Sequence, residues 1–142
     1  MKKSKLFLLN KFKSLLTKKG KSTDSEKILL TVFRVIHSRG YNVLKVLTLA
    51  INNVKPIVQL KKKKKRGTSQ IIPRPISLKS QISKAIKSLI LTSKNSGNNN
   101  IIESLASELI ESSNRRSRTF KDSQLLHKQA IQNKSFSHYR WL

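Results

Sequence analysis

Six consecutive basic residues, Lys61 to Arg66, lie near the middle of the chain and restrict how that part of it can fold. A run of this kind is often only a solvated face of the molecule, so its meaning depends on the element that carries it. The flanking residues Ile57 to Leu60 and Gln70 to Ile76 have an extended pattern, and Gly67-Thr68-Ser69 is typical of a turn. The pattern predicts a two-stranded β-hairpin over residues 57–76.

Two prolines in the second predicted strand, Pro73 and Pro75, argue against a central position in a sheet. Both strands of a two-stranded ribbon are edges, where proline is tolerated, so we expect the ribbon to project from the rest of the molecule. Since successive strand residues point to opposite faces, the cations of residues 61–66 are expected to make the arm cationic on all sides.

The rest of the chain has apolar residues at helical spacing, interrupted at Gly20, Gly40, Pro56 and residues 95–100. The predicted fold class is mainly α, with about six helices and the hairpin between the third and the fourth, in a single domain over residues 1–142. The predicted apolar stripes are Leu8, Phe12, Leu15 and Leu16; Ile28, Val32, Val35 and Ile36; Val43, Leu47, Ala50, Ile51 and Val54; Ile82, Ile86, Leu89 and Ile90; Ile101, Ile102, Leu105, Leu109 and Ile110; and Leu125, Leu126, Ala130 and Ile131.

Capping patterns predict where several helices begin. Thr23-Asp24-Ser25-Glu26 and Thr119-Phe120-Lys121-Asp122 have the capping-box spacing, in which a hydroxyl and a carboxylate satisfy free amides of the first turn. Asn42 is expected to cap the third helix. The fifth helix holds three of the six acids, which we expect on its solvent face: Glu103, Glu108 and Glu111.

The charge balance indicates the kind of partner. The chain has 31 Lys+Arg against 6 Asp+Glu, a formal net charge of +25, and no cysteine. Repulsion among so many like charges destabilises an isolated compact chain, which favours a polyanionic partner and above all nucleic acid. The few acids and the lack of a glycine-rich loop or a thiol predict that the protein is not an enzyme.

No metal, cofactor or small-molecule substrate is expected. His127 and His138 are eleven residues apart, about 16 Å along a helix, which is too far to share a metal ion. No uncharged run approaches the ~20 residues of a membrane span, so no membrane partner is expected. The short basic amphipathic segment Leu6 to Leu16 leaves binding to a membrane surface as a third and weaker hypothesis.

Basic clusters outside the hairpin fall at predicted chain ends and loops, an arrangement that suits the many backbones of a folded RNA better than one duplex groove. At the C-terminus, Trp141 is expected to pack on the core and Arg140 to contact RNA. The charge alone equally allows a free-standing basic nucleic-acid-binding protein of an organelle. The RNA contacts predicted from the clusters are Lys2, Lys3, Lys5, Lys18, Lys19, Lys21, Lys61, Lys62, Lys63, Lys64, Lys65, Arg66, Arg115, Arg116, Arg118 and Arg140.

Several short motifs follow one another in an order known from a single family. They are Gly20-Lys21-Ser22-Thr23, then Ala50 through Asn53-Val54-Lys55-Pro56, then Gly67-Thr68-Ser69 with Pro73, and finally Leu126, His127, Ala130, Asn133, Phe136 and His138-Tyr139-Arg140-Trp141. In this order they resemble the universal small-subunit ribosomal protein seven family, of the bacterial or organellar type. The resemblance covers roughly residues 8–141, and no single motif would suffice for it.

The resemblance implies a bundle of about six helices with a projecting hairpin after the third, which the periodicity predicts separately. It also implies a structural protein of the small ribosomal subunit that binds the 3′ major domain of the small-subunit rRNA and nucleates assembly of the head. The hairpin would face messenger RNA and the exit-site tRNA, and neighbouring head proteins would be partners. By position, the resemblance adds Arg74 and Lys79 to the expected rRNA contacts.

The chain departs from the family pattern at the hairpin turn, where paired glycines become Arg66-Gly67. The arginine-rich start of the fourth helix is reduced to Ser77-Leu78-Lys79, which weakens the implied rRNA contact there. The chain ends at Trp141-Leu142 without the bacterial extension, and its Ile, Lys, Asn and Ser content is typical of AT-biased coding. Both features favour the mitochondrial matrix over the plastid.

Overall fold

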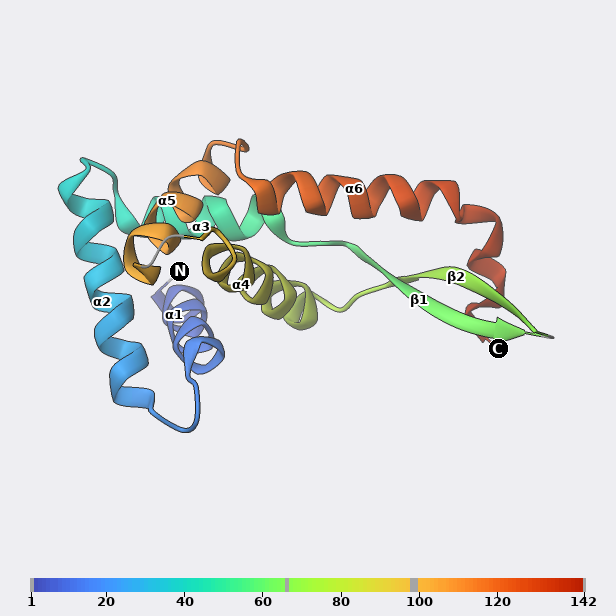
Figure 1. Cartoon of the computed structure of the whole chain (residues 1–142), viewed down its shortest axis with the longest axis horizontal. Coiled ribbons are helices and arrows are strands. Elements are labelled where there is room, and N and C mark those ends of the chain that lie inside the picture. The colour runs from blue at the N-terminus through green and yellow to red at the C-terminus, as the bar shows by residue number, and fades with distance from the viewer. Residues whose placement is uncertain (1, 66, 98–99, 142) are drawn as a thin grey trace.

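The computed structural model describes residues 2–65, 67–97 and 100–141, and the side chains of these residues except 2–5, 65, 68 and 139–141. Helices α1 to α5 gather into one body, a hairpin extends from it, and α6 lies beside the hairpin (Figure 1). The expected mainly α fold with its hairpin between the third and fourth helices is confirmed. The elements are α1 Lys2–Leu16, α2 Ser22–Ser38, α3 Val43–Val54, β1 Val58–Lys65, β2 Thr68–Pro75, α4 Leu78–Lys94, α5 Ile101–Ser113, α6 Arg118–Gln132 and a 3₁₀ helix, η1, Lys134–Trp141.

Helix α5 is the centre of the body, because α2, α3, α4 and α6 all pack against it. Its Leu105, Ala106 and Leu109 are 0% exposed. Burial of an aliphatic side chain of this size stabilises the fold by ~1.5–3 kcal/mol. The apolar stripes predicted for the first five helices supply the buried core, which includes Phe12, Leu16, Val32, Ile36, Leu47, Ala50, Ile51, Val54, Ile86, Leu89, Ile90, Leu105, Leu109 and Ile110.

The predicted boundaries of α3 are confirmed. Asn42 caps the helix, since its Oδ1 accepts a hydrogen bond from the Lys45 backbone N–H at 3.2 Å. At the other end α3 stops at Val54, two residues before Pro56, as expected from the missing amide of proline and its steric effect on the preceding residue. These two signals fix where the chain leaves the body for the hairpin.

Both predicted capping boxes are wrong. Helix α2 begins at Ser22, so Thr23 lies inside the first turn, and no side chain caps the helix. Helix α6 begins one residue before Thr119, and its cap is Ser117, whose hydroxyl accepts from the Phe120 N–H at 3.0 Å. In each box a polar residue has a partner on another helix instead: Glu26 pairs with Lys13 of α1, and Thr119 bonds Glu108 of α5.

The prediction that Glu108 faces solvent is also wrong. Glu108 is 9% exposed, and its Oε1 accepts from the Thr119 N–H at 3.3 Å and from Thr119 Oγ1 at 2.5 Å. Beside it, Ser112 Oγ donates to Ser117 Oγ at 2.9 Å. Asn53 Nδ2 donates to the carbonyl oxygens of Ser112 and Ser113, both at 3.0 Å. These side chains form a polar joint that holds the start of α6 to α5 and α3.

The hairpin is confirmed over its predicted residues, except that Thr68 and Ser69, expected in the turn, belong to β2. Strands β1 and β2 pair antiparallel from Val58 opposite Pro75 to Lys65 opposite Thr68. A further bond from the Ile76 N–H to the Ile57 carbonyl, at 3.1 Å, continues the pairing to residues 57 and 76. The hairpin extends from the body, as expected, and Pro73 and Pro75 are accommodated because both strands are edges.

The expectation that the arm is cationic on all sides is right only in part. The exposed Lys61 lies on one face of β1 and the exposed Lys62 and Lys64 on the other, but part of the hairpin is covered by other elements. Helix α6 runs along β1, and η1 turns back against β2 (Figure 1). His127 Nε2 accepts a hydrogen bond from the Ile57 N–H at 3.2 Å, and Ile72 is only 2% exposed. One side of the hairpin is therefore covered by α6 and η1.

The same arrangement corrects the predicted stripe of the last helix. Leu125 and Ile131 are exposed, whereas Ala130 is buried and Leu126 is half-buried. Because α6 leaves the body to lie on the hairpin, it buries one narrow side only. The predicted packing of Trp141 falls on side chains outside the described part of the chain.

Candidate nucleic-acid interface

The hairpin presents lysines on both faces of its outer half. Lys61, Lys62 and Lys64 are exposed and Lys63 is half-buried. Residues on one face of a strand repeat every ~7 Å, so the lysines form two short rows along β1. The opposite residues on β2, from Ile72 to Ser69, carry no charge. The side chains of Lys65 and Arg66 lie outside the described residues.

The turn between α1 and α2 carries the second cluster, formed by the exposed residues Lys18, Lys19 and Lys21. Lys19 has φ 52° and Gly20 has φ 76°, both in the left-handed region. Glycine adopts this conformation without steric cost, which explains Gly20 at this position. The Ser22 N–H bonds the Gly20 carbonyl at 2.9 Å and closes the turn.

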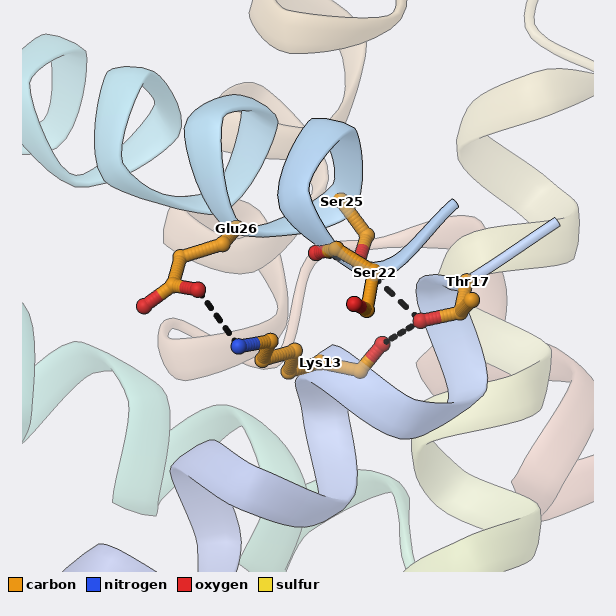
Figure 2. Close-up of polar contacts among 5 residues, drawn as sticks. All are labelled: Lys13, Thr17, Ser22, Ser25 and Glu26. Atoms are coloured by element: carbon orange, nitrogen blue, oxygen red, sulfur yellow. Dashed lines mark hydrogen bonds and ion pairs between the residues drawn. The ribbon is translucent and has the colours of Figure 1, made fainter. Parts of the chain in front are cut away.

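A polar cluster between α1 and α2 holds this turn in place (Figure 2). Thr17 Oγ1 donates to the Lys13 carbonyl at 2.8 Å and lies 3.0 Å from Ser25 Oγ, which donates to the Ser22 carbonyl at 2.8 Å. Lys13 and Glu26 form an ion pair across the same junction. The lysines of the turn therefore extend from a fixed base.

The start of α2 adds a positive dipole to this cluster. No side chain caps the helix, and its N-cap residue is Lys21 itself. The amides at the start of a helix attract anions, and phosphate groups commonly bind there. An uncapped helix start beside three lysines is an arrangement that suits an RNA phosphate.

The turn between α5 and α6 carries the third cluster. Arg115 and Arg116 are exposed, and Arg115 has φ 59°. The Arg116 N–H bonds the Glu111 carbonyl at 2.9 Å, so the turn is closed onto the end of α5. Arg118 was expected in the loop but is the first residue of α6. Ser112 and Ser117, which belong to the polar joint around Glu108, lie on either side of this turn in the chain and are hydrogen-bonded to each other.

The three clusters lie far apart on one framework. In Figure 1 the α1–α2 turn, the α5–α6 turn and the hairpin are at three separate extremities of the molecule. Among the side chains that the structure describes, the only ion pair between a lysine or arginine and a carboxylate is Lys13 with Glu26. The clusters therefore keep their positive charge for an outside partner.

Six further predicted contacts are less informative. Lys79 is exposed near the start of α4, and Arg74 is half-buried on β2. Lys2, Lys3 and Lys5 belong to α1 and Arg140 to η1, but their side chains fall outside the described part of the chain. The structure thus places the backbone of these residues and leaves their contacts as predictions.

Helix α6 carries a basic row that the sequence did not predict. Arg118, Lys121 and Lys128 are exposed and spaced by three and seven residues, which puts them on one side of a helix. That side is opposite the buried Thr119 and Ala130. The spacing of these three cations could have predicted the row, but Leu125, which lies on the same side of the helix, was assigned to the apolar stripe.

Other kinds of site find no support in the described part of the chain. It holds no group of three or more His, Asp or Glu side chains that could bind a metal ion. None of its helices has the length and apolar character needed to traverse a bilayer. The basic clusters are therefore the candidate functional site.

Comparison with known proteins decides the family. The sequence model of the family described as Ribosomal protein S7p/S5e matches residues 1–134. This chain belongs to the ribosomal protein S7p/S5e family. The S7p/S5e proteins are structural rather than catalytic, in agreement with the expectation that the chain is not an enzyme.

Curated relatives of the S7p/S5e family match nearly the whole chain. The small ribosomal subunit protein uS7 of Xylella fastidiosa (strain M12) is 31% identical over 92% of this chain and 84% of its own length. The protein of the same name from Syntrophus aciditrophicus (strain SB) is 31% identical over 98% of this chain and 90% of its own length. The one from Helicobacter hepaticus (strain ATCC 51449 / 3B1) is 33% identical over 94% and 87%.

Proposed function

We propose that this protein is a structural component of the small ribosomal subunit that binds rRNA through basic clusters on a rigid helical frame. The observation that carries the proposal is the family match together with three separated clusters of unpaired cations. A folded RNA offers many backbone phosphates at once, and each cluster can neutralise a different segment. Residues 1–142 would act as one domain with residues 57–76 as its arm.

The proposed rRNA contacts are the basic residues that the sequence predicts, and the exposed ones among the described side chains form the three clusters. Phosphate contacts fix register and orientation without reading sequence. Contacts of this kind depend on where the lysines and arginines are held, which the turns at Gly20 and Arg115 determine. The residues are Lys2, Lys3, Lys5, Lys18, Lys19, Lys21, Lys61, Lys62, Lys63, Lys64, Lys65, Arg66, Arg74, Lys79, Arg115, Arg116, Arg118 and Arg140.

Within the subunit, we propose that the RNA is the 3′ major domain of the small-subunit rRNA and that binding nucleates assembly of the head. The motif resemblance supports this, and so does the spread of the clusters over three extremities. The hairpin carries its lysines away from the body, where they can meet messenger RNA and the exit-site tRNA. Neighbouring head proteins would cover exposed apolar side chains such as Leu30 and Leu44.

The proposed location is the mitochondrial small ribosomal subunit. The support is compositional: the chain is rich in Ile, Lys, Asn and Ser, as AT-biased organellar coding produces. The alternative function, a free-standing nucleic-acid-binding protein, would share the charge but would have no preference for one rRNA.

The test is sedimentation of the tagged chain from the source cells, with fractionation of organelles. We expect the protein to sediment with small-subunit particles, and with those of mitochondria in particular. Finding it only in a ribosome-free pool would exclude the proposed function. Finding it on ribosomes of another compartment would correct the location alone.

A charge-reversal variant tests the hairpin within the same assay. The triple variant Lys62→Glu, Lys63→Glu and Lys64→Glu is expected to reduce incorporation into particles. Its matched control is Lys45→Glu, Lys87→Glu and Lys94→Glu, which makes the same change in net charge at exposed lysines outside the clusters. Equal incorporation of the two triple variants would contradict a role for the hairpin lysines.

A further inference from the structure

A surface pocket of about 440 Å³ lies where the hairpin leaves the body and α6 passes over it. Pockets of ~300–1,000 Å³ are typical of small-ligand sites. Its wall comes from segments far apart in the sequence, the two strands on one side and α6 with η1 on the other. The lining residues are Ile57, Val58, Pro73, Arg74, Pro75, His127, Ala130, Ile131, Lys134 and Ser137.

The pocket combines an exposed apolar rim with fixed walls. Ile57 is 60% exposed and Ile131 is 72% exposed, so each wall of the pocket has one large aliphatic side chain that is accessible to solvent. The hydrogen bond from the Ile57 N–H to His127 Nε2 ties the two walls together at 3.2 Å. The pocket is thus preformed.

The charged residues of the lining all have the same sign. Arg74 and Lys134 belong to it, and none of the lining residues is a carboxylate. Arg74 Nε is buried and has no hydrogen-bond partner among the described residues. Buried donors are satisfied in the great majority of cases, so an unsatisfied guanidinium nitrogen at a pocket points to an acceptor supplied from outside.

We propose that this pocket takes an unpaired RNA base, with the flanking phosphate or a base acceptor on Arg74 and Lys134. The inference rests on the proposed function, since it assumes that the partner is RNA. An unstacked base is a flat ligand joined to an anionic backbone, and such bases stack on aromatic rings, including that of histidine, and on arginine planes; the lining supplies His127 and Arg74. An apolar pocket with basic residues and no acid complements both parts of that ligand.

The experiment uses the full chain and two RNA hairpins of equal length, one fully paired and one with a single bulged 2-aminopurine. The wild-type protein is expected to bind the bulged RNA more tightly and to change the 2-aminopurine fluorescence. In the variant Ile57→Ser with Ile131→Ser, the affinity for the bulged RNA should fall about fivefold or more, as for loss of one stacked base. The affinity for the paired RNA should stay within about twofold.

The matched control is Leu44→Ser with Leu91→Ser, which removes two exposed aliphatic side chains from α3 and α4. Arg74→Lys keeps the charge, removes the Nε donor and should lower the preference for the bulged RNA. Equal preference for the two RNAs in the wild type, or identical behaviour of the two double variants, would overturn the inference. Failure of the wild type to bind either RNA would instead reject RNA binding itself.

Discussion

The helical body and the hairpin arm are held together in different ways. In the body, α5 is surrounded by four helices, and Leu105 and Leu109 have no exposed surface. In the arm, a two-stranded ribbon is supported from one side by α6 and η1, and Ile72 is its one fully buried side chain among the described strand residues. Isolated two-stranded ribbons are marginal in water, so the arm depends on α6.

This difference suits the proposed function. A tightly packed body can hold the α1–α2 and α5–α6 turns at fixed positions. A thin arm can carry lysines beyond the body, and its stability can increase when RNA binds to it, because a ligand that binds only the ordered form stabilises that form. We therefore expect changes in the body to act on the whole molecule and changes in the arm to act locally.

The largest effect is expected in the body. Leu109→Ala removes a fully buried side chain and leaves a cavity, which costs ~2–5 kcal/mol of the free energy of unfolding. Leu91→Ala, at an exposed position of α4, should change it by less than ~0.5 kcal/mol. Urea unfolding followed by circular dichroism measures both. Similar values for the two variants would mean that α5 is not the centre of the core.

The next effect tests the joint between body and arm. Glu108→Ala leaves the Thr119 amide and hydroxyl without their acceptor, at a cost of ~1–3 kcal/mol. Hydrogen exchange should show faster opening of α6 and of the hairpin that it supports. Glu111→Ala, on the exposed side of α5, is the control. Unchanged exchange in α6 of the Glu108 variant would argue against the joint.

A smaller and more local effect is expected in the arm. Ile72→Ala removes its buried side chain and should cost about 2 kcal/mol, the low end of the range for such truncations, because the ribbon is packed from one side only. Hydrogen exchange should accelerate in β1 and β2 while α5 is unaffected. Ile71→Ala, half-buried on the opposite face, should do less. Equal acceleration in the body would show that arm and body unfold as one unit.

The smallest effect is expected at the ion pair of α1 and α2. Lys13 and Glu26 are 34% and 53% exposed, so solvent screens their attraction and Glu26→Gln should cost no more than ~0.5 kcal/mol. Thr17→Val, which removes the hydroxyl between Lys13 and Ser25, should cost more. Thermal unfolding of the two variants compares them. A larger loss for Glu26→Gln would give the ion pair a structural role.

The body could be predicted from the sequence and the arm only in part. Helical periodicity located the core because residues such as Val32 and Leu109 pack within neighbouring helices of regular geometry. The presence of the hairpin and its bounds followed from the extended flanks, but the pairing of its residues was not predicted, and Thr68 and Ser69, expected in the turn, belong to β2. The cover of the hairpin could not be predicted, since Ile57 and His127 meet across seventy residues and no local pattern records that contact.

The candidate site shows the same limit. The clusters at Lys18, Lys61 and Arg115 could be predicted because their basic residues are adjacent in the sequence, and their exposure is as expected. Glu108 was misplaced because an acid in a helix is usually exposed, and its partner Thr119 lies on another helix. The pocket at the base of the hairpin could not be predicted from the sequence, because its walls come from distant segments that only the fold brings together.

The most direct test of the central claim is to map protein–RNA crosslinks on the chain in purified small ribosomal subunits. The account predicts crosslinked peptides from the α1–α2 turn, the hairpin and the α5–α6 turn, all to one rRNA and at separate segments of it. Crosslinks confined to a single cluster, or spread over unrelated RNAs, would contradict a rigid frame that binds one folded RNA at several points.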